Sequence, residues 1–103
     1  MGTRLELQEE LASVAGPSFR VYYQPPVNVE IEYPCIMYEL DRPYSRSADN
    51  MTYAFMRQYQ LTVITRDADC DLPERLVKHF PLCREERTFV SDNLYHTILN
   101  IYF

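Results

Sequence analysis

Residues 51–66 read MTYAFMRQYQLTVITR, the longest stretch of the chain with the pattern of a single element. Large apolar side chains recur at its odd positions, its even positions are mixed, and β-branched and aromatic residues dominate. This period of two predicts a β-strand. At about 3.3 Å per residue, such a strand is too long to be covered by a domain whose radius of gyration is about 13 Å. We therefore expect either a bulge that bends the strand or a projecting part that meets another molecule.

The residues before this strand predict the other half of a β-hairpin. Residues 34–40 (PCIMYEL) alternate like a strand, and residues 41–50 (DRPYSRSADN) have the composition of a loop. The connection is longer than the about two to five residues usual for a hairpin, and long connections are often functional. This loop carries Arg42, Tyr44 and Arg46, residue types that are enriched at protein contacts.

The N-terminal residues predict a capped helix. Thr3 and Glu6 have the spacing of a capping box, in which each side chain accepts a hydrogen bond from the other residue's backbone N–H. Apolar residues then recur at helical spacing, and Gly16 with Pro17 stops the pattern. We expect a helix over residues 4–15.

The remaining elements are predicted in the same way. Residues 72–80 predict a short helix that follows a polar turn. Residues 19–23, 87–90 and 94–103 predict strands, and residues 27–33 predict either another strand or an extended connector. The order α-β-(β)-β-β-α-β-β indicates one α+β domain over residues 1–103. We expect a mostly antiparallel sheet with a long β-hairpin, whose tip over about residues 41–57 projects, and two helices packed on one face.

Composition narrows the class of protein. The formal charge is −5 without a basic run, which disfavours tight binding to duplex nucleic acid. No apolar stretch approaches the length of about 18 residues that a membrane span needs. Three cysteines without CxxC spacing fit reduced thiols rather than a disulfide framework. Nine tyrosines and five phenylalanines suit either a small core or a protein interface.

The sequence favours neither a catalytic, nor a metal, nor a cofactor site. His79 and His96 lack a nucleophile motif, and His79 is separated from Cys83 by Pro81, which disfavours a zinc site. The aspartates of residues 67–71 alternate, but the glycine and glutamate of a calcium loop are missing. We expect a solvated turn there, His96 on the sheet face opposite the apolar row of its strand, and cysteines packed as small apolar groups.

Two segments carry a resemblance to a known group of proteins. Residues 59–76 (YQLTVITRDADCDLPERL), residues 88–103 (TFVSDNLYHTILNIYF) and the order of elements resemble the small tail terminator, tail completion and head–tail joining proteins of long-tailed (siphovirus-type) bacteriophages. The resemblance implies a homo-oligomeric ring, commonly a hexamer, that ends the tail tube and contacts the head connector or neck proteins, with DNA passing through its lumen. It implies a virion protein that is assembled in the host cytoplasm and has no catalytic residues.

The resemblance and the overlong hairpin together predict where subunits meet. The expected interface residues are Arg42, Tyr44, Arg46, Met51, Tyr53, Phe55 and Arg57. Arg57 has a second interpretation, a side chain that extends to solvent at the rim of the sheet. Two other functions remain open: a small cytosolic adaptor or inhibitor that binds a partner through an exposed sheet edge, and a small enzyme or metal protein that uses the histidines and cysteines.

Overall fold

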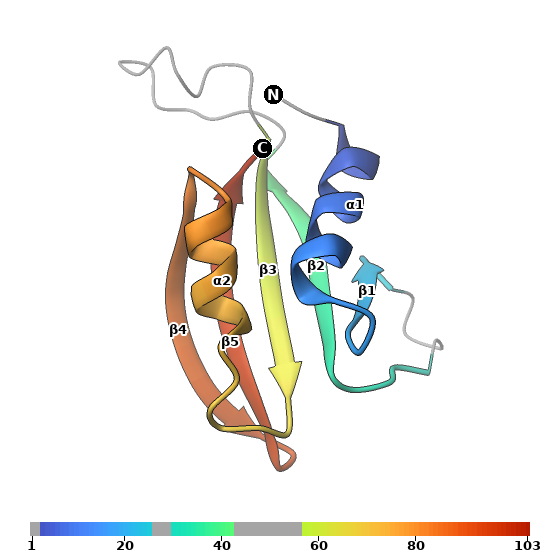
Figure 1. Ribbon diagram of the computed structural model, residues 1–103, viewed down its shortest axis with the longest axis vertical. Coiled ribbons are helices and arrows are strands. Elements are labelled where there is room, and N and C mark those ends of the chain that lie inside the picture. Colours follow the sequence, from blue (N-terminus) through green and yellow to red (C-terminus); the bar gives the residue numbers. More distant parts are fainter. Residues whose placement is uncertain (1–2, 26–29, 43–56) are drawn as a thin grey trace.

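Two helices and a five-stranded sheet make up residues 3–25, 30–42 and 57–103, the part of the chain that this computed structural model describes (Figure 1). In chain order the elements are α1 (Arg4–Ala15), β1 (Arg20–Tyr23), β2 (Cys35–Arg42), β3 (Gln58–Thr65), α2 (Leu72–His79), β4 (Cys83–Ser91) and β5 (Leu94–Tyr102). The strands lie in the order β1-β2-β3-β5-β4. The predicted α+β class is confirmed.

The sheet is antiparallel except at one edge. β1 runs parallel to β2, whereas β2 with β3, β3 with β5 and β5 with β4 are antiparallel. The predicted hairpin is therefore present as β2 and β3, with Tyr38 opposite Leu61 and Arg42 opposite Gln58. Because β3 is the middle strand, its side chains set the centre of the core.

Helix α1 begins as its sequence predicts. The Thr3 hydroxyl accepts from the Glu6 N–H at 3.2 Å, and the Glu6 carboxylate accepts from the Thr3 N–H at 3.4 Å. At the other end, Gly16 has a φ of 86°, a backbone conformation that side chains disfavour. The helix packs on the sheet through the buried residues Leu7 and Leu11.

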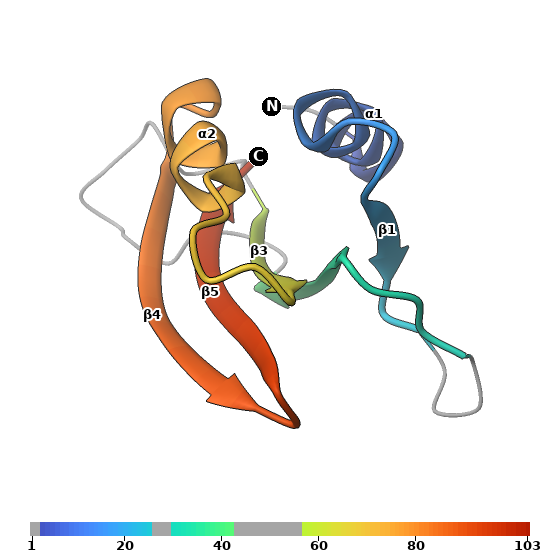
Figure 2. The same ribbon diagram turned by 60° about the horizontal axis from the view of Figure 1, so that its bottom comes forward.

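Both helices cover the same face of the sheet (Figure 2). β2, β3 and β5 present alternate residues to this face, and most of these are almost fully buried. Leu40 of β2, which is 36% exposed, and the half-buried Tyr95 of β5 are exceptions. The core consists of Leu7, Leu11, Ala15, Ile36, Tyr38, Tyr59, Leu61, Val63, Leu72, Leu76, Phe80, Leu99 and Ile101. Tyr59, Leu61 and Val63 of β3 thus lie in one core with residues of both helices.

The opposite face, called the outer face below, carries a smaller apolar cluster at one end. Cys35, Ile64 and Leu94 are buried there, and the connector that precedes β2 packs on them through Ile31 and Tyr33. Residues 30–33 form no strand, so in this part of residues 27–33 the connector interpretation holds. Residues 26–29 lie outside the described residues.

Several element boundaries differ from the sequence expectations. β3 begins at Gln58, so Arg57 precedes the strand instead of lying within it, and residues 51–56 lie outside the described part. β2 continues to Arg42, two residues into the expected loop. β4 covers Cys83–Ser91 rather than 87–90. The start of this strand could not be predicted from the pattern of its residues. It is an edge strand exposed on both faces, so its residues can be charged throughout and need not alternate between apolar and polar.

The central position of β3 gives a stability prediction. Leu61 is fully buried and stands between Tyr38 of β2 and Leu99 of β5. Leu61→Ala should lower the free energy of unfolding by about 2–5 kcal/mol, through lost transfer energy and a cavity. Urea denaturation followed by circular dichroism measures the change. Leu5→Ala is the control, since Leu5 is 63% exposed; an equal loss in both variants would contradict the assigned core.

Candidate functional site

Strand β4 is an exposed edge of the sheet. It pairs with β5 on one side, and no other strand of residues 3–25, 30–42 and 57–103 lies along its second side (Figures 1 and 2). Eight of its nine residues are exposed, including residues on both faces. Edge strands carry unpaired backbone donors and acceptors, which can pair with a strand of another chain.

The first half of β4 is shaped by a bulge at Glu86. Glu85 lies opposite Leu99 and Arg87 lies opposite Ile98, so Glu86 is an extra residue without a partner in the register. Its side chain is held on the sheet: Asn100 Nδ2 donates to Glu86 Oε1 at 2.6 Å, and Arg84 Nη2 lies 3.0 Å from the same oxygen. The bond from Arg84, and then that from Asn100, lowers the pKa of Glu86. Bulges and charges of this kind block pairing at a sheet edge.

The second half of β4 lacks this protection. Phe89 stacks on His96 of β5 with ring centroids 4.8 Å apart and planes 8° from parallel, and the Arg87 guanidinium lies 5.2 Å from the Phe89 centroid. Val90, on the helix-side face, is 62% exposed. Asp92 and Asn93 then turn the chain with positive φ values, as tight hairpins require. The regular, mostly uncharged stretch from Arg87 to Ser91, whose last four residues read TFVS, is called the TFVS edge below.

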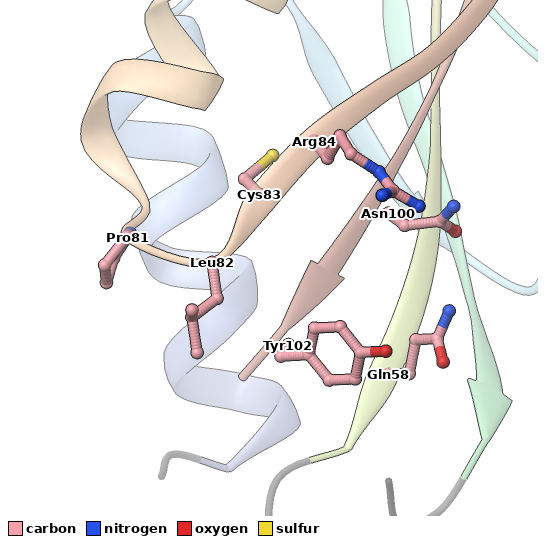
Figure 3. A pocket seen from close by; sticks show the side chains of 7 residues that line it. All are labelled: Gln58, Pro81, Leu82, Cys83, Arg84, Asn100 and Tyr102. Carbon is pink, nitrogen blue, oxygen red and sulfur yellow. The ribbon is translucent and has the colours of Figure 1, made fainter. Parts of the chain in front are cut away.

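A shallow cavity of about 370 Å³ lies where β4 begins. It is lined by Gln58, Pro81, Leu82, Cys83, Arg84, Asn100 and Tyr102 (Figure 3). Figure 3 shows the Tyr102 hydroxyl pointing towards Gln58 and the Arg84 side chain extending to Asn100. Burial raises the pKa of the Cys83 thiol to about 11, so at neutral pH the thiol stays protonated and is a poor nucleophile. The lining is mixed, with Pro81 and Leu82 beside the polar side chains of Gln58, Arg84 and Asn100.

The predicted interface residues fall mostly outside the described part. Tyr44, Arg46, Met51, Tyr53 and Phe55 lie within residues 43–56, which the structure does not describe.

The two predicted interface residues that flank this segment can be placed. Arg42 ends β2, and Arg57 is exposed directly before β3. The Phe103 N–H donates to the Arg57 carbonyl at 2.9 Å, which fixes the backbone at Arg57. Both positions lie at the same end of the sheet, because Arg42 pairs with Gln58.

The two histidines have separate local partners. His79 Nε2 lies 3.2 Å from Glu10 Oε1 and joins α2 to α1. His96 Nδ1 lies 3.1 Å from the Leu94 carbonyl, on the outer face as expected. These contacts position neither histidine beside a nucleophile.

The cysteines and aspartates also have structural roles. Cys35 is buried, Cys70 and Cys83 pack partly against the core, and all three are free thiols. Asp67 Oδ1 accepts from the Asp69 N–H at 2.9 Å within an exposed turn. Among the described residues, no group of three or more potential ligands has the geometry to hold a metal ion.

Comparisons of the chain with protein-family models, with curated proteins and with solved structures found no match. Within the described ranges, no helix is both long and apolar enough to span a membrane.

The contacts of Glu86 predict a measurable titration. Its pKa lies below the ordinary value because Arg84 and Asn100 bind the ionised form, so the contact is complete above the ordinary pKa and is lost as pH falls through the lowered one. Arg84→Met should raise the pKa of Glu86, as measured by NMR of its side-chain carboxyl carbon. Arg75→Met on α2 is the control. An unchanged Glu86 titration in Arg84→Met would contradict the assigned contact.

Proposed function

We propose that the protein is a structural virion protein: a subunit of a homo-oligomeric ring, hexameric by the resemblance, at the head-proximal end of a long-tailed bacteriophage tail. In this role it terminates or completes the tail tube and joins it to the head connector. The resemblance of residues 59–76 and 88–103 motivates this assignment. The observation in the structure that best supports it is the open surface of the sheet.

The open surface has two parts. Among the described residues, helices α1 and α2 cover one face of the sheet, while on the outer face the connector before β2 packs at one end (Figure 2). β4 is exposed along almost its whole length. A subunit that is stabilised by one buried face and presents another face and an edge to solvent is suited to packing against further chains.

The anchoring of the segment 43–56 is consistent with this role. Both of its flanks are fixed at one end of the sheet, through the pairing of Arg42 with Gln58 and the bond from Phe103 to Arg57. Any contact made by residues 43–56 would thus be coupled to a rigid sheet. The predicted interface residues within that segment remain predictions.

The net negative charge of the chain favours a conduit for DNA over a protein that binds DNA. The formal charge of each chain is −5, and a hexamer would carry about −30. Acidic groups at the lumen would repel phosphates and let DNA pass without being retained. The proposal requires part of this charge to face the lumen.

Particle mass tests the ring directly. We expect light scattering coupled to size-exclusion chromatography to give a mass of several chains, and negative-stain electron microscopy to show rings. The tail-tube protein of the same phage, added to the purified protein, should bind the particle. The proposal would be overturned if the protein stays monomeric at every concentration and does not bind the tube protein.

Two substitutions test the predicted subunit contact. Phe55→Ala and Arg57→Ala should lower the fraction of chains in the ring and leave the midpoint of urea unfolding of the monomer unchanged. Leu5→Ala, which removes an apolar side chain from an exposed position on α1, is the control. Unfolding of the isolated chain by Phe55→Ala would show that this residue belongs to the core instead.

The exposed edge of β4 also favours a second function, that of a small adaptor or inhibitor that adds a partner's strand to its sheet. Deletion of residues 43–50 separates the two functions. Under the ring proposal, assembly is lost and the fold survives. Under the adaptor proposal, self-association hardly changes and binding of a partner to β4 persists.

A further inference from the structure

We propose that the TFVS edge pairs with the same edge of a second copy, antiparallel and about a two-fold axis that passes beside Phe89. The two sheets would then continue into one. This contact is separate from the predicted ring contact at residues 41–57, and it does not depend on the proposed viral function.

The limits of the usable edge are set by the structure. The bulge at Glu86 interrupts β4 on one side, and the turn at Asp92 and Asn93 ends it on the other. Between them Arg87–Ser91 pair regularly with β5. The middle residue of this stretch is Phe89.

Symmetry then restricts how two such edges can pair. Two identical strands pair antiparallel about an axis perpendicular to the sheet, so each residue lies opposite one on the same face. Because each residue must lie opposite one on the same face of the sheet, the axis can pass only beside a residue of the edge, and only a few registers are possible. Centring the axis on Arg87 would place like charges directly opposite, which is unfavourable, and centring it on Thr88 would extend the pairing into the bulge. Centring it on Val90 would extend the pairing into the turn.

The register centred on Phe89 uses the whole regular stretch and pairs compatible side chains. Phe89 lies opposite its symmetry mate, Thr88 opposite Val90, and Arg87 opposite Ser91. Aromatic pairs and pairs of β-branched residues are favourable neighbours across strands. No like charges are opposed within Arg87–Ser91.

On the outer face, contacts within one chain already position the side chain of Phe89, which would form the central pair. Phe89 is stacked on His96 and has Arg87 over its ring, so its side chain is held in place before a second copy binds. Pairing would extend the row into His96, Phe89, Phe89 and His96 across the two copies. Val90, the most exposed large apolar residue of β4, would be covered on the other face by the second copy's Thr88.

Such a contact closes after two copies, because the same patch is used on both sides. It therefore converts a monomer into a dimer, and it converts a ring into a pair of rings where its two-fold axis crosses the ring axis at a right angle. Five residues of strand pairing make a small interface, so we expect weak, concentration-dependent association. Loss of the ring contact would change the mass of the particle before it doubles. Loss of the edge contact would change only whether that particle doubles.

Opposite charges at position 89 test the register. Phe89→Lys should weaken the doubling about tenfold, because two ammonium groups would stand opposite each other, and Phe89→Glu should do the same. An equimolar mixture of the two variants should restore it, since Lys then faces Glu. Sedimentation equilibrium measures association, and native mass spectrometry with one variant ¹⁵N-labelled identifies the mixed particle. Val77→Lys on α2 is the matched control.

Each outcome decides the proposal. Restoration in the mixture supports the pairing at Phe89 and also shows that both variants fold. The proposal is overturned if wild-type protein does not double at millimolar concentration, if Phe89→Lys doubles like wild type, or if the mixture forms no excess of mixed particles. If the mixture fails because a variant is unfolded by circular dichroism, Thr88→Lys mixed with Val90→Glu, whose charges also face each other, supplies the same test.

Discussion

The burial of one face of the sheet beneath α1 and α2 is the constraint on which the rest of the structure depends. Leu61 and Val63 of the middle strand lie in one core with Leu7 and Leu11 of α1 and Leu72 and Leu76 of α2. β2 adds Ile36 to this core, and β5 adds Leu99 and Ile101. Burial of apolar surface is the dominant favourable term in folding, and this layer is the larger of the two buried apolar clusters in the described residues. Since the period of a strand is two, the same alternation that fills this face directs the remaining side chains away from both helices.

The open outer face is a direct consequence. Within residues 3–25, 30–42 and 57–103, two helices of twelve and eight residues cover one face of the five-stranded sheet and no helix covers the other. On that other face the connector packs through Ile31 and Tyr33 near Cys35. β4 lies farthest from this cover and is exposed on both sides. Contact with other chains is thus one way for such a fold to bury more surface, and both the proposed ring and the proposed edge pairing would use it.

Elements defined by local chemistry could be predicted from the sequence. The capping box of Thr3 and Glu6, the apolar stripe of α1, and the alternation of residues 59–65 each involve neighbours in sequence, and each is present. The first half of β4 could not be predicted, because Arg84, Glu85 and Glu86 show no alternation of polarity and a bulge interrupts the register there. The TFVS edge could not be recognised as a site, because its exposure follows from the strand order β3-β5-β4, a long-range property that no local pattern encodes.

The two halves of β4 differ in how they would receive a strand of another chain. In the first half, Glu86 is drawn into the bulge by Asn100 and Arg84, so an incoming strand would meet a broken ladder and charged side chains. In the second half, pairing is permitted over Arg87–Ser91 alone, between the bulge and the turn. A longer uninterrupted edge would accept many registers and partners, whereas five residues with Phe89 at their centre favour one. The bulge therefore converts a general liability of edge strands into a short contact of defined register.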